Sequence, residues 1–469
     1  MTLTPLIVII STLIVIVIVL RFSTNTADSK PLFTTEQASI TKHKTVFSST
    51  LSPASPIKES NTGSSSPSCI TYTPSTRTIT VTCTSASMTE IYNKLQDNSI
   101  LNKQSSPQGG TSNIWFLNAN LIIAKGATFH IDSTNTKWLK ISSKVTHGAG
   151  SAKIAPAYIL DVRGSLKIDS VKITSWDPTT NYYAITNGSR TGDITHPGAP
   201  RPSIVVENNA TGTTDITNSE IAYLGYEQGQ HKGGSGLSYY YGGDGSIIRN
   251  NDIHHLYFGL YTFGVGHMII ENNIIRNSGH YGLDPHTGTH DMIIRNNIVY
   301  NNNGSGIICS LNCYNILIEN NKVHDNTGDG IDFSRNMYNS IARNNIIYNE
   351  PAGVLVSQSH YNQIYNNTVS TSGNGIYVNS GSTNNKMYDN TLMNSKSHAI
   401  LINNGSNSNT FYSNKIVSTI KEGLEIGQDA TSTNNVFSNN QVINSASPNN
   451  TSANEIQKRN NSENDGKGH

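Results

Sequence analysis

The chain has 469 residues, of which 35% are hydrophobic and only 13% charged, a polar mixture for a protein of this length. Lysine and arginine number 32 against 31 aspartate and glutamate residues. This balance creates no field that would attract nucleic acid or an anionic membrane surface, so it argues against those partners. The composition suits a stack of small repeats better than one thick globular core.

The chain begins with an apolar segment, residues 1–21, that we interpret as a signal anchor or a signal peptide. Residues 6–20 are rich in Ile and Val and are followed by Arg21. Residues 3–20 approach the length that spans a bilayer and would serve as a membrane tether if retained. Neither a basic n-region nor a small-residue cleavage site is evident, so both interpretations stay open.

The segment 22–68 is rich in Ser and Thr and is predicted to be a disordered linker, because it is too polar to bury itself. An apolar leader followed by such a linker indicates a secreted or cell-surface protein. Cys69 and Cys83 flank two alternating runs, 70–73 and 78–82, that read as a β-hairpin. A disulfide across this hairpin fits an oxidising compartment, with two free thiols as the alternative.

A short helix is expected after the hairpin. Ser87 and Glu90 have the spacing of a capping box, and the helix should end near Leu95. We interpret residues 69–112 as a small N-terminal cap that covers the open end of a solenoid.

The remainder of the chain is repetitive, which predicts the fold class. A short Ile-rich run followed by two asparagines returns every 22 to 24 residues, the length of one coil of a parallel β-helix. The clearest asparagine pairs are Asn250–Asn251, Asn272–Asn273, Asn296–Asn297, Asn320–Asn321 and Asn344–Asn345. We therefore predict an all-β, right-handed parallel β-helix over residues 113–445, and a disordered tail over 446–469.

A recurring glycine fixes the register of one strand in each coil: Gly236, Gly259, Gly282, Gly306, Gly330 and Gly353. The first and third residues after it are mostly apolar and should point inward, so the second and fourth should point outward. The first predicted outward column is Ser238, Tyr261, Asp284, Ile308 and Asp332. The second is Tyr240, Phe263, His286, Ser310 and Ser334, with Tyr241 and Arg335 one step further along.

Chemistry-bearing side chains thus gather on a few adjacent coils. We interpret Asp284 and His286 as functional residues, because Pro285 between them has no backbone N–H to donate to the neighbouring strand. Other members have structural alternatives: Tyr240 and its neighbours could form cross-strand stacks, and Asp332 could be a solvated face residue or an ion-pair partner for the neighbouring arginine.

The run 280–286, His-Tyr-Gly-Leu-Asp-Pro-His, resembles the Asp-Pro-His-Asp region of the mannuronan (alginate) C5-epimerases. Segments 174–177, 222–226 and 306–310 add to this resemblance, which covers roughly residues 114–345. It implies C5-epimerisation of uronate residues, of the mannuronate-to-guluronate type, in an anionic polysaccharide bound along the β-helix face.

The resemblance and the predicted columns together define the candidate site. The catalytic candidates are His280, Asp284, His286, Tyr261 and Arg335. The substrate-binding candidates are Lys232, Tyr240, Tyr257, Arg276 and Asp332. Either histidine could remove the C5 proton, Tyr261 or Tyr257 could return one, and Asp284 would orient an imidazole.

The chain departs from the family at two places. Thr287 stands where the motif has a second Asp, and residues 303–305 replace the basic residues expected before the next strand. Either the cation that neutralises the substrate carboxylate comes from Arg335, Arg276 or Lys232, or the substrate differs from that of the family.

Two rival functions stay open. A polysaccharide lyase shares proton abstraction and then expels the C4 oxygen, and a non-catalytic surface β-helix would only bind glycans. No metal site is predicted, because the histidines lack ligand spacing: His254, His255, His267, His286 and His290. We expect a monomer without an obligatory cofactor, with Ca²⁺ at the carboxylates near Asp325 and Asp329 as an alternative.

Overall fold

The computed structural model describes residues 68–104, 112–143, 157–185, 201–226, 234–446 and 451–452. The predicted leader 1–21 lies outside the described residues, as do nearly all of the linker 22–68 and of the tail 446–469. Within the described ranges, no helix has the length and apolarity that a bilayer crossing requires.

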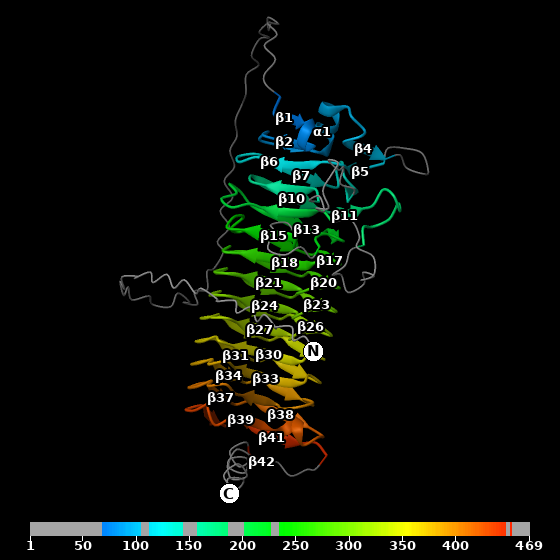
Figure 1. Cartoon of the computed structure of the whole chain (residues 1–469). Coiled ribbons are helices and arrows are strands. Elements are labelled where there is room, and N and C mark those ends of the chain that lie inside the picture. Colours follow the sequence, from blue (N-terminus) through cyan, green and yellow to red (C-terminus); the bar gives the residue numbers. More distant parts are fainter. Residues whose placement is uncertain are drawn as a thin grey trace, which may run out of the picture. The chain divides into compact units, whose positions relative to one another are not determined.

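Three long sheets run the length of the described stack, and each coil contributes one strand to each sheet (Figure 1). We name them sheets A, B and C. Neighbouring strands are parallel except for the pairs β1–β2, β4–β5 and β41–β42, which are antiparallel. The chain is therefore a right-handed parallel β-helix, as predicted.

Sheet A has 14 strands: β1 (Ile70–Thr73), β2 (Thr78–Val81), β6 (Asn120–Ile123), β9 (Ile159–Val162), β12 (Ser203–Val206), β15 (Gly236–Tyr240), β18 (Phe258–Phe263), β21 (Leu283–His286), β24 (Ile307–Ser310), β27 (Ile331–Ser334), β30 (Ala352–Ser357), β33 (Asn374–Asn379), β36 (Ile400–Ile402) and β39 (Ile426–Gln428). Sheet B has 13 strands: β3 (Ala86–Ser87), β7 (Thr128–Asp132), β10 (Ser165–Asp169), β13 (Thr214–Thr217), β16 (Ile247–Arg249), β19 (Ile269–Glu271), β22 (Ile293–Arg295), β25 (Leu317–Glu319), β28 (Ile341–Arg343), β31 (Gln363–Tyr365), β34 (Lys386–Tyr388), β37 (Thr410–Tyr412) and β40 (Val436–Ser438). Sheet C has 15 strands: β4 (Leu101–Gln104), β5 (Ile114–Leu117), β8 (Trp138–Ser142), β11 (Lys172–Trp176), β14 (Glu220–Ala222), β17 (Asp252–His254), β20 (Ile274–Arg276), β23 (Ile298–Tyr300), β26 (Lys322–His324), β29 (Ile346–Tyr348), β32 (Thr368–Ser370), β35 (Thr391–Met393), β38 (Lys415–Ser418), β41 (Gln441–Asn444) and β42 (Thr451–Ser452).

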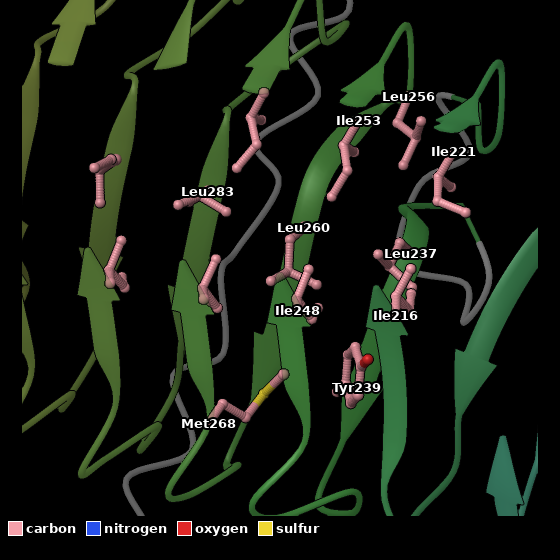
Figure 2. Packing of buried hydrophobic residues seen from close by; sticks show 14 of the residues in the cluster. Ile216, Ile221, Leu237, Tyr239, Ile248, Ile253, Leu256, Leu260, Met268 and Leu283 are labelled. Atoms are coloured by element: carbon pink, nitrogen blue, oxygen red, sulfur yellow. The ribbon is translucent and has the colours of Figure 1, made fainter. Parts of the chain in front are cut away.

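The core is a column of aliphatic side chains contributed by all three sheets. Figure 2 shows Leu260 and Leu283 of sheet A together with Ile248 of sheet B and Ile253 of sheet C. All four are at most 1% exposed. A single coil cannot bury these side chains, so each coil depends on its neighbours for its share of the hydrophobic free energy.

The two asparagines of each repeat have different tasks. The first takes the left-handed backbone conformation, as at Asn320, where φ is 56°. The second is buried: Asn321 accepts hydrogen bonds from the backbone N–H and the Nδ2 of Asn297, both 3.0 Å long, and donates to the Oδ1 of Asn345 at 3.1 Å. An asparagine ladder therefore links successive coils.

The N-terminal features agree with the sequence analysis. Cys69 and Cys83 form a disulfide across the β1–β2 hairpin. Helix α1 (Met88–Leu95) begins with the capping box of Ser87 and Glu90. Two short 3₁₀ helices, η1 (Pro74–Thr76) and η2 (Glu422–Leu424), complete the elements.

Candidate active site on sheet A

The outward columns predicted from the glycine register are present on sheet A. Tyr261 pairs with Asp284 across β18 and β21, and Phe263 pairs with His286 in the same two strands. His286 in turn pairs with Ser310 of β24. Between β21 and β24 the register holds at Leu283 and His286, the positions that flank the Asp-Pro dipeptide, as expected of a proline within a strand.

The two aspartates of the first column are buried, although they lie on the outer side of the sheet. Asp284 is 2% exposed and Asp332 is 6% exposed, so the solvated-face interpretation of Asp332 was wrong. Burial raises the pKa of both carboxyl groups well above the usual value for aspartate, while Arg335 opposes the shift in each case. The Oδ1 atom of each has no hydrogen-bond partner among the described residues.

Arg335 contacts the second column instead of forming the ion pair with Asp332 that the sequence suggested. Its Nε donates to the Oγ of Ser310 at 2.8 Å, and its Nη2 contacts the same hydroxyl. The Nη2 also lies 3.3 Å from the Nε2 of His286. Arg335 follows the end of β27 and has a left-handed φ of 52°, so its side chain does not continue the alternation of the strand. Its charged group stays exposed and accessible to an anion.

His286 is a neutral imidazole held by two contacts. Its Nδ1 lies 2.5 Å from the Oγ1 of Thr287, the residue that replaces the motif aspartate. Because a guanidinium can only donate, the Nε2 that faces Arg335 is the acceptor and Nδ1 carries the proton. Burial, assisted by the charge of Arg335, lowers the pKa of His286 to about 4.

Tyr261 occupies the centre of the candidate site. Its ring centroid is 5.6 Å from that of His286 and 5.7 Å from that of Tyr240. Burial and the neighbouring Asp284 raise the pKa of the Tyr261 phenol well above its ordinary value. The phenol therefore keeps its proton at neutral pH. It can donate a hydrogen bond, or give up its proton to a carbanion as a general acid.

His280 lies among aromatic rings on the other side of Tyr261. Its ring is stacked on Phe258, with centroids 5.1 Å apart, and is 4.0 Å from the ring of Tyr281. Tyr257 is 5.9 Å away, and Phe258 also contacts Tyr261 at 5.5 Å. The sequence analysis did not single out Phe258 and Tyr281. Each directly precedes a register glycine, and that position is the signal that would have identified them.

Two candidate cations are not part of this group. Arg276 belongs to β20 of sheet C, where its Nε and Nη2 donate to the carboxylate of Asp252 at 3.1 and 2.8 Å. Lys232 lies outside the described residues. Of the three predicted cations, Arg335 is the one that the described part of the structure places beside another catalytic candidate, His286. The proposed orienting contact from Asp284 to an imidazole is also not made through Oδ1.

Comparisons with known proteins place the fold among β-helices. The family model described as periplasmic copper-binding protein (NosD) matches residues 204–400. No curated protein matches the chain.

Among solved structures, the periplasmic alginate epimerase AlgG matches with a TM-score of 0.65 and 20% identity, over 78% of this chain and 85% of that one. A double mutant of AlgG matches over the same shares with a TM-score of 0.66 and 19% identity. The A-module of the mannuronan C-5 epimerase AlgE6 from Azotobacter vinelandii matches at 12% identity over 70% of this chain and 88% of that one, with a TM-score of 0.39. The likeness to AlgG establishes a shared right-handed parallel β-helix, and the reaction has to be argued from the side chains.

Proposed function

We propose that the chain is a polysaccharide epimerase that inverts C5 of uronate residues, of the mannuronate-to-guluronate type, and that it acts outside the cytoplasm. The observation that carries the proposal is the arrangement on adjacent coils of sheet A. An exposed arginine, two imidazoles and a protonated phenol lie on the coils next to Asp284, a buried aspartate whose Oδ1 has no partner among the described residues. The Asp-Pro-His motif and the likeness to AlgG support the same reaction class.

The reaction requires a cation because C5 bears a carboxylate that is already negative. Removal of the C5 proton adds negative charge to that carboxylate. A hydrogen-bond donor or cation beside it therefore stabilises the transition state more than the ground state. Arg335 meets this requirement because its guanidinium is exposed and can form a two-point contact with a carboxylate. Adjacent coils are about 4.8 Å apart, which lets a polymer lie across several of them.

We assign proton abstraction to His280 and proton return to Tyr261. His286 is a weak base in its present setting, because its pKa is about 4 and its Nε2 accepts a hydrogen bond from Arg335. We therefore give His286 the task of positioning Arg335. The proton taken from C5 passes to His280, and the phenol proton of Tyr261 is delivered to the opposite face of the carbanion. Both groups are then reset by exchange with water.

The experiment is proton NMR of polymannuronate incubated in D₂O with the full-length chain. Epimerisation predicts new guluronate signals and deuterium at C5, with no change in polymer length. Ultraviolet-absorbing unsaturated ends would indicate a lyase instead, and an unchanged polymer would contradict action on this uronan. His280→Asn should abolish exchange, whereas Tyr377→Phe, four coils beyond β21 on the same sheet, should not affect it.

A further inference from the structure

A second cluster of polar side chains lies in the turns that follow β18 and β21, beyond the candidate active site. His267, His290 and Asp291 place one potential ligand atom each within 4.8 Å of the others. The Nδ1 of His290 is 2.8 Å from the Oδ2 of Asp291, and the two imidazole rings are nearly perpendicular with centroids 5.6 Å apart. The proposed epimerase reaction uses none of these three residues.

The fold aligns two of these residues by register. A β-bridge joins Gly266 to His290, so the residues that follow them, His267 and Asp291, occupy equivalent positions on adjacent coils. Both have the left-handed backbone, with φ of 60° and 50°. The next two coils place asparagine at the same turn position, at Asn315 and Asn339, with φ of 55° and 51°. Two consecutive coils thus replace the usual turn asparagine with residues that bind metals.

The third side chain is held in place from both sides. A Cβ on Gly266 would lie only 2.5 Å from the Cε1 of His290, so the glycine leaves the space that this ring occupies. The ring of Tyr314 stacks on His290 with centroids 5.0 Å apart and planes at 11°. The imidazole is therefore confined between its two neighbouring coils, where it faces His267.

We propose that His267, His290 and Asp291 form a binding site for a divalent transition-metal cation of the Zn²⁺ type. Two imidazoles and a carboxylate suit cations of this type, whereas Ca²⁺ and Mg²⁺ favour sites made of oxygen ligands alone. Zn²⁺ binds nitrogen and oxygen ligands at about 2.0–2.2 Å, with water in a fourth position. Small side-chain rotations are needed to reach that geometry, because the ligand atoms lie within 4.8 Å of one another and the Nδ1 of His290 is 2.8 Å from the Oδ2 of Asp291. The exposed side chains of His267 and Asp291 can make these rotations, while the His290 ring stays packed between its neighbours.

Asparagine at the same turn position of the following coils indicates which substitutions should preserve the fold. His267→Asn and Asp291→Asn each restore the residue type that the following coils use at this position. Gly266→Ala would push the His290 ring aside without changing a ligand. His324→Asn is the matched control, because His324 and Asp325 form a similar pair at 2.7 Å that is not part of a metal-binding group of three residues within the described ranges.

The experiment is isothermal titration of the full-length, chelator-treated chain with Zn²⁺. We expect one site that weakens at least about tenfold in His267→Asn and in Asp291→Asn, and that also weakens in Gly266→Ala. The thermal midpoint should rise with Zn²⁺ in the wild type and in His324→Asn, and should rise less in the ligand variants. Affinities within twofold of wild type in both ligand variants would overturn the proposal. So would the absence of Zn²⁺ binding by the wild-type chain.

Discussion

Replacing Arg335 with glutamine tests the proposed role of the guanidinium most directly. The side chain is exposed, and its hydrogen bonds to the described residues go to Ser310 and His286. Removing one donor that stabilises developing negative charge costs about 10²–10³ in kcat, or roughly 3–4 kcal/mol. The loss of an exposed hydrogen bond costs folding only about 1 kcal/mol. Activity should therefore fall by two to three orders of magnitude while the thermal midpoint changes little.

The same substitution should change the titration of His286. The guanidinium lies 3.3 Å from Nε2 and disfavours the imidazolium, but burial is the larger cause of the low pKa. Without the arginine, the pKa of His286 should rise from about 4 and stay below its ordinary value, because burial remains. Proton NMR of labelled histidine Cε1 across pH 3–8 measures the shift.

The assay for activity is deuterium incorporation at C5 of polymannuronate, measured as kcat and KM. Arg343→Gln is the control for the loss of a positive charge, since Arg343 pairs with Glu319 on sheet B. An Arg335→Gln enzyme that keeps more than a third of wild-type kcat would refute the assignment of this residue as the neutralising cation.

Three further outcomes follow from the structure. Tyr261→Phe should lower kcat by about 10²–10⁴ with little change in KM, because the ring remains and only the proton donor is lost; a change confined to KM would contradict the acid role. Asn321→Leu removes four hydrogen bonds and should destabilise the fold by about 4 kcal/mol in urea unfolding, whereas Asn320→Gly, which keeps the left-handed turn, should cost well under 1 kcal/mol. Burial raises the pKa of Glu350 from 4.5 to about 8, so the stability that it contributes is complete below about pH 4.5 and lost as pH rises through about 8. The thermal midpoint of Glu350→Gln should therefore fall less than that of the wild type between pH 6 and pH 9, and parallel curves would show that Glu350 titrates normally.

The columns could be predicted from the sequence because two periodicities are strict. The side chains of a strand alternate in direction, and the register glycine returns once in each coil from Gly236 to Gly353. Even the irregular pairing between Gly236 and Ser238 leaves Ser238 aligned with Tyr261. The asparagine pairs likewise indicated the length of one coil, and the structure shows that the second asparagine of each pair continues a hydrogen-bonded ladder.

The side-chain environment could not be predicted in the same way. A solvated position was one alternative for Asp332, and the alternation of side chains along a strand does not reveal that this residue is buried. An ion pair with Asp332 was one alternative for Arg335, but the arginine has a left-handed backbone and its side chain contacts Ser310. Arg276 was offered as a site cation, although it follows an asparagine turn and so belongs to sheet C, where Asp252 neutralises it.

Glu350 and Asp284 are both buried acids, but they differ in their hydrogen bonding. Glu350 is 2% exposed, but both of its carboxyl oxygens accept hydrogen bonds from Asn326, at 2.8 and 3.1 Å, so it continues a ladder. Asp284 is equally buried, yet its Oδ1 has no partner among the described residues. An unpaired buried polar atom costs about 1–3 kcal/mol, and the ladder shows how readily this fold can satisfy an acid. If the proposed function holds, we expect a bound substrate to supply the partner that the Oδ1 of Asp284 lacks.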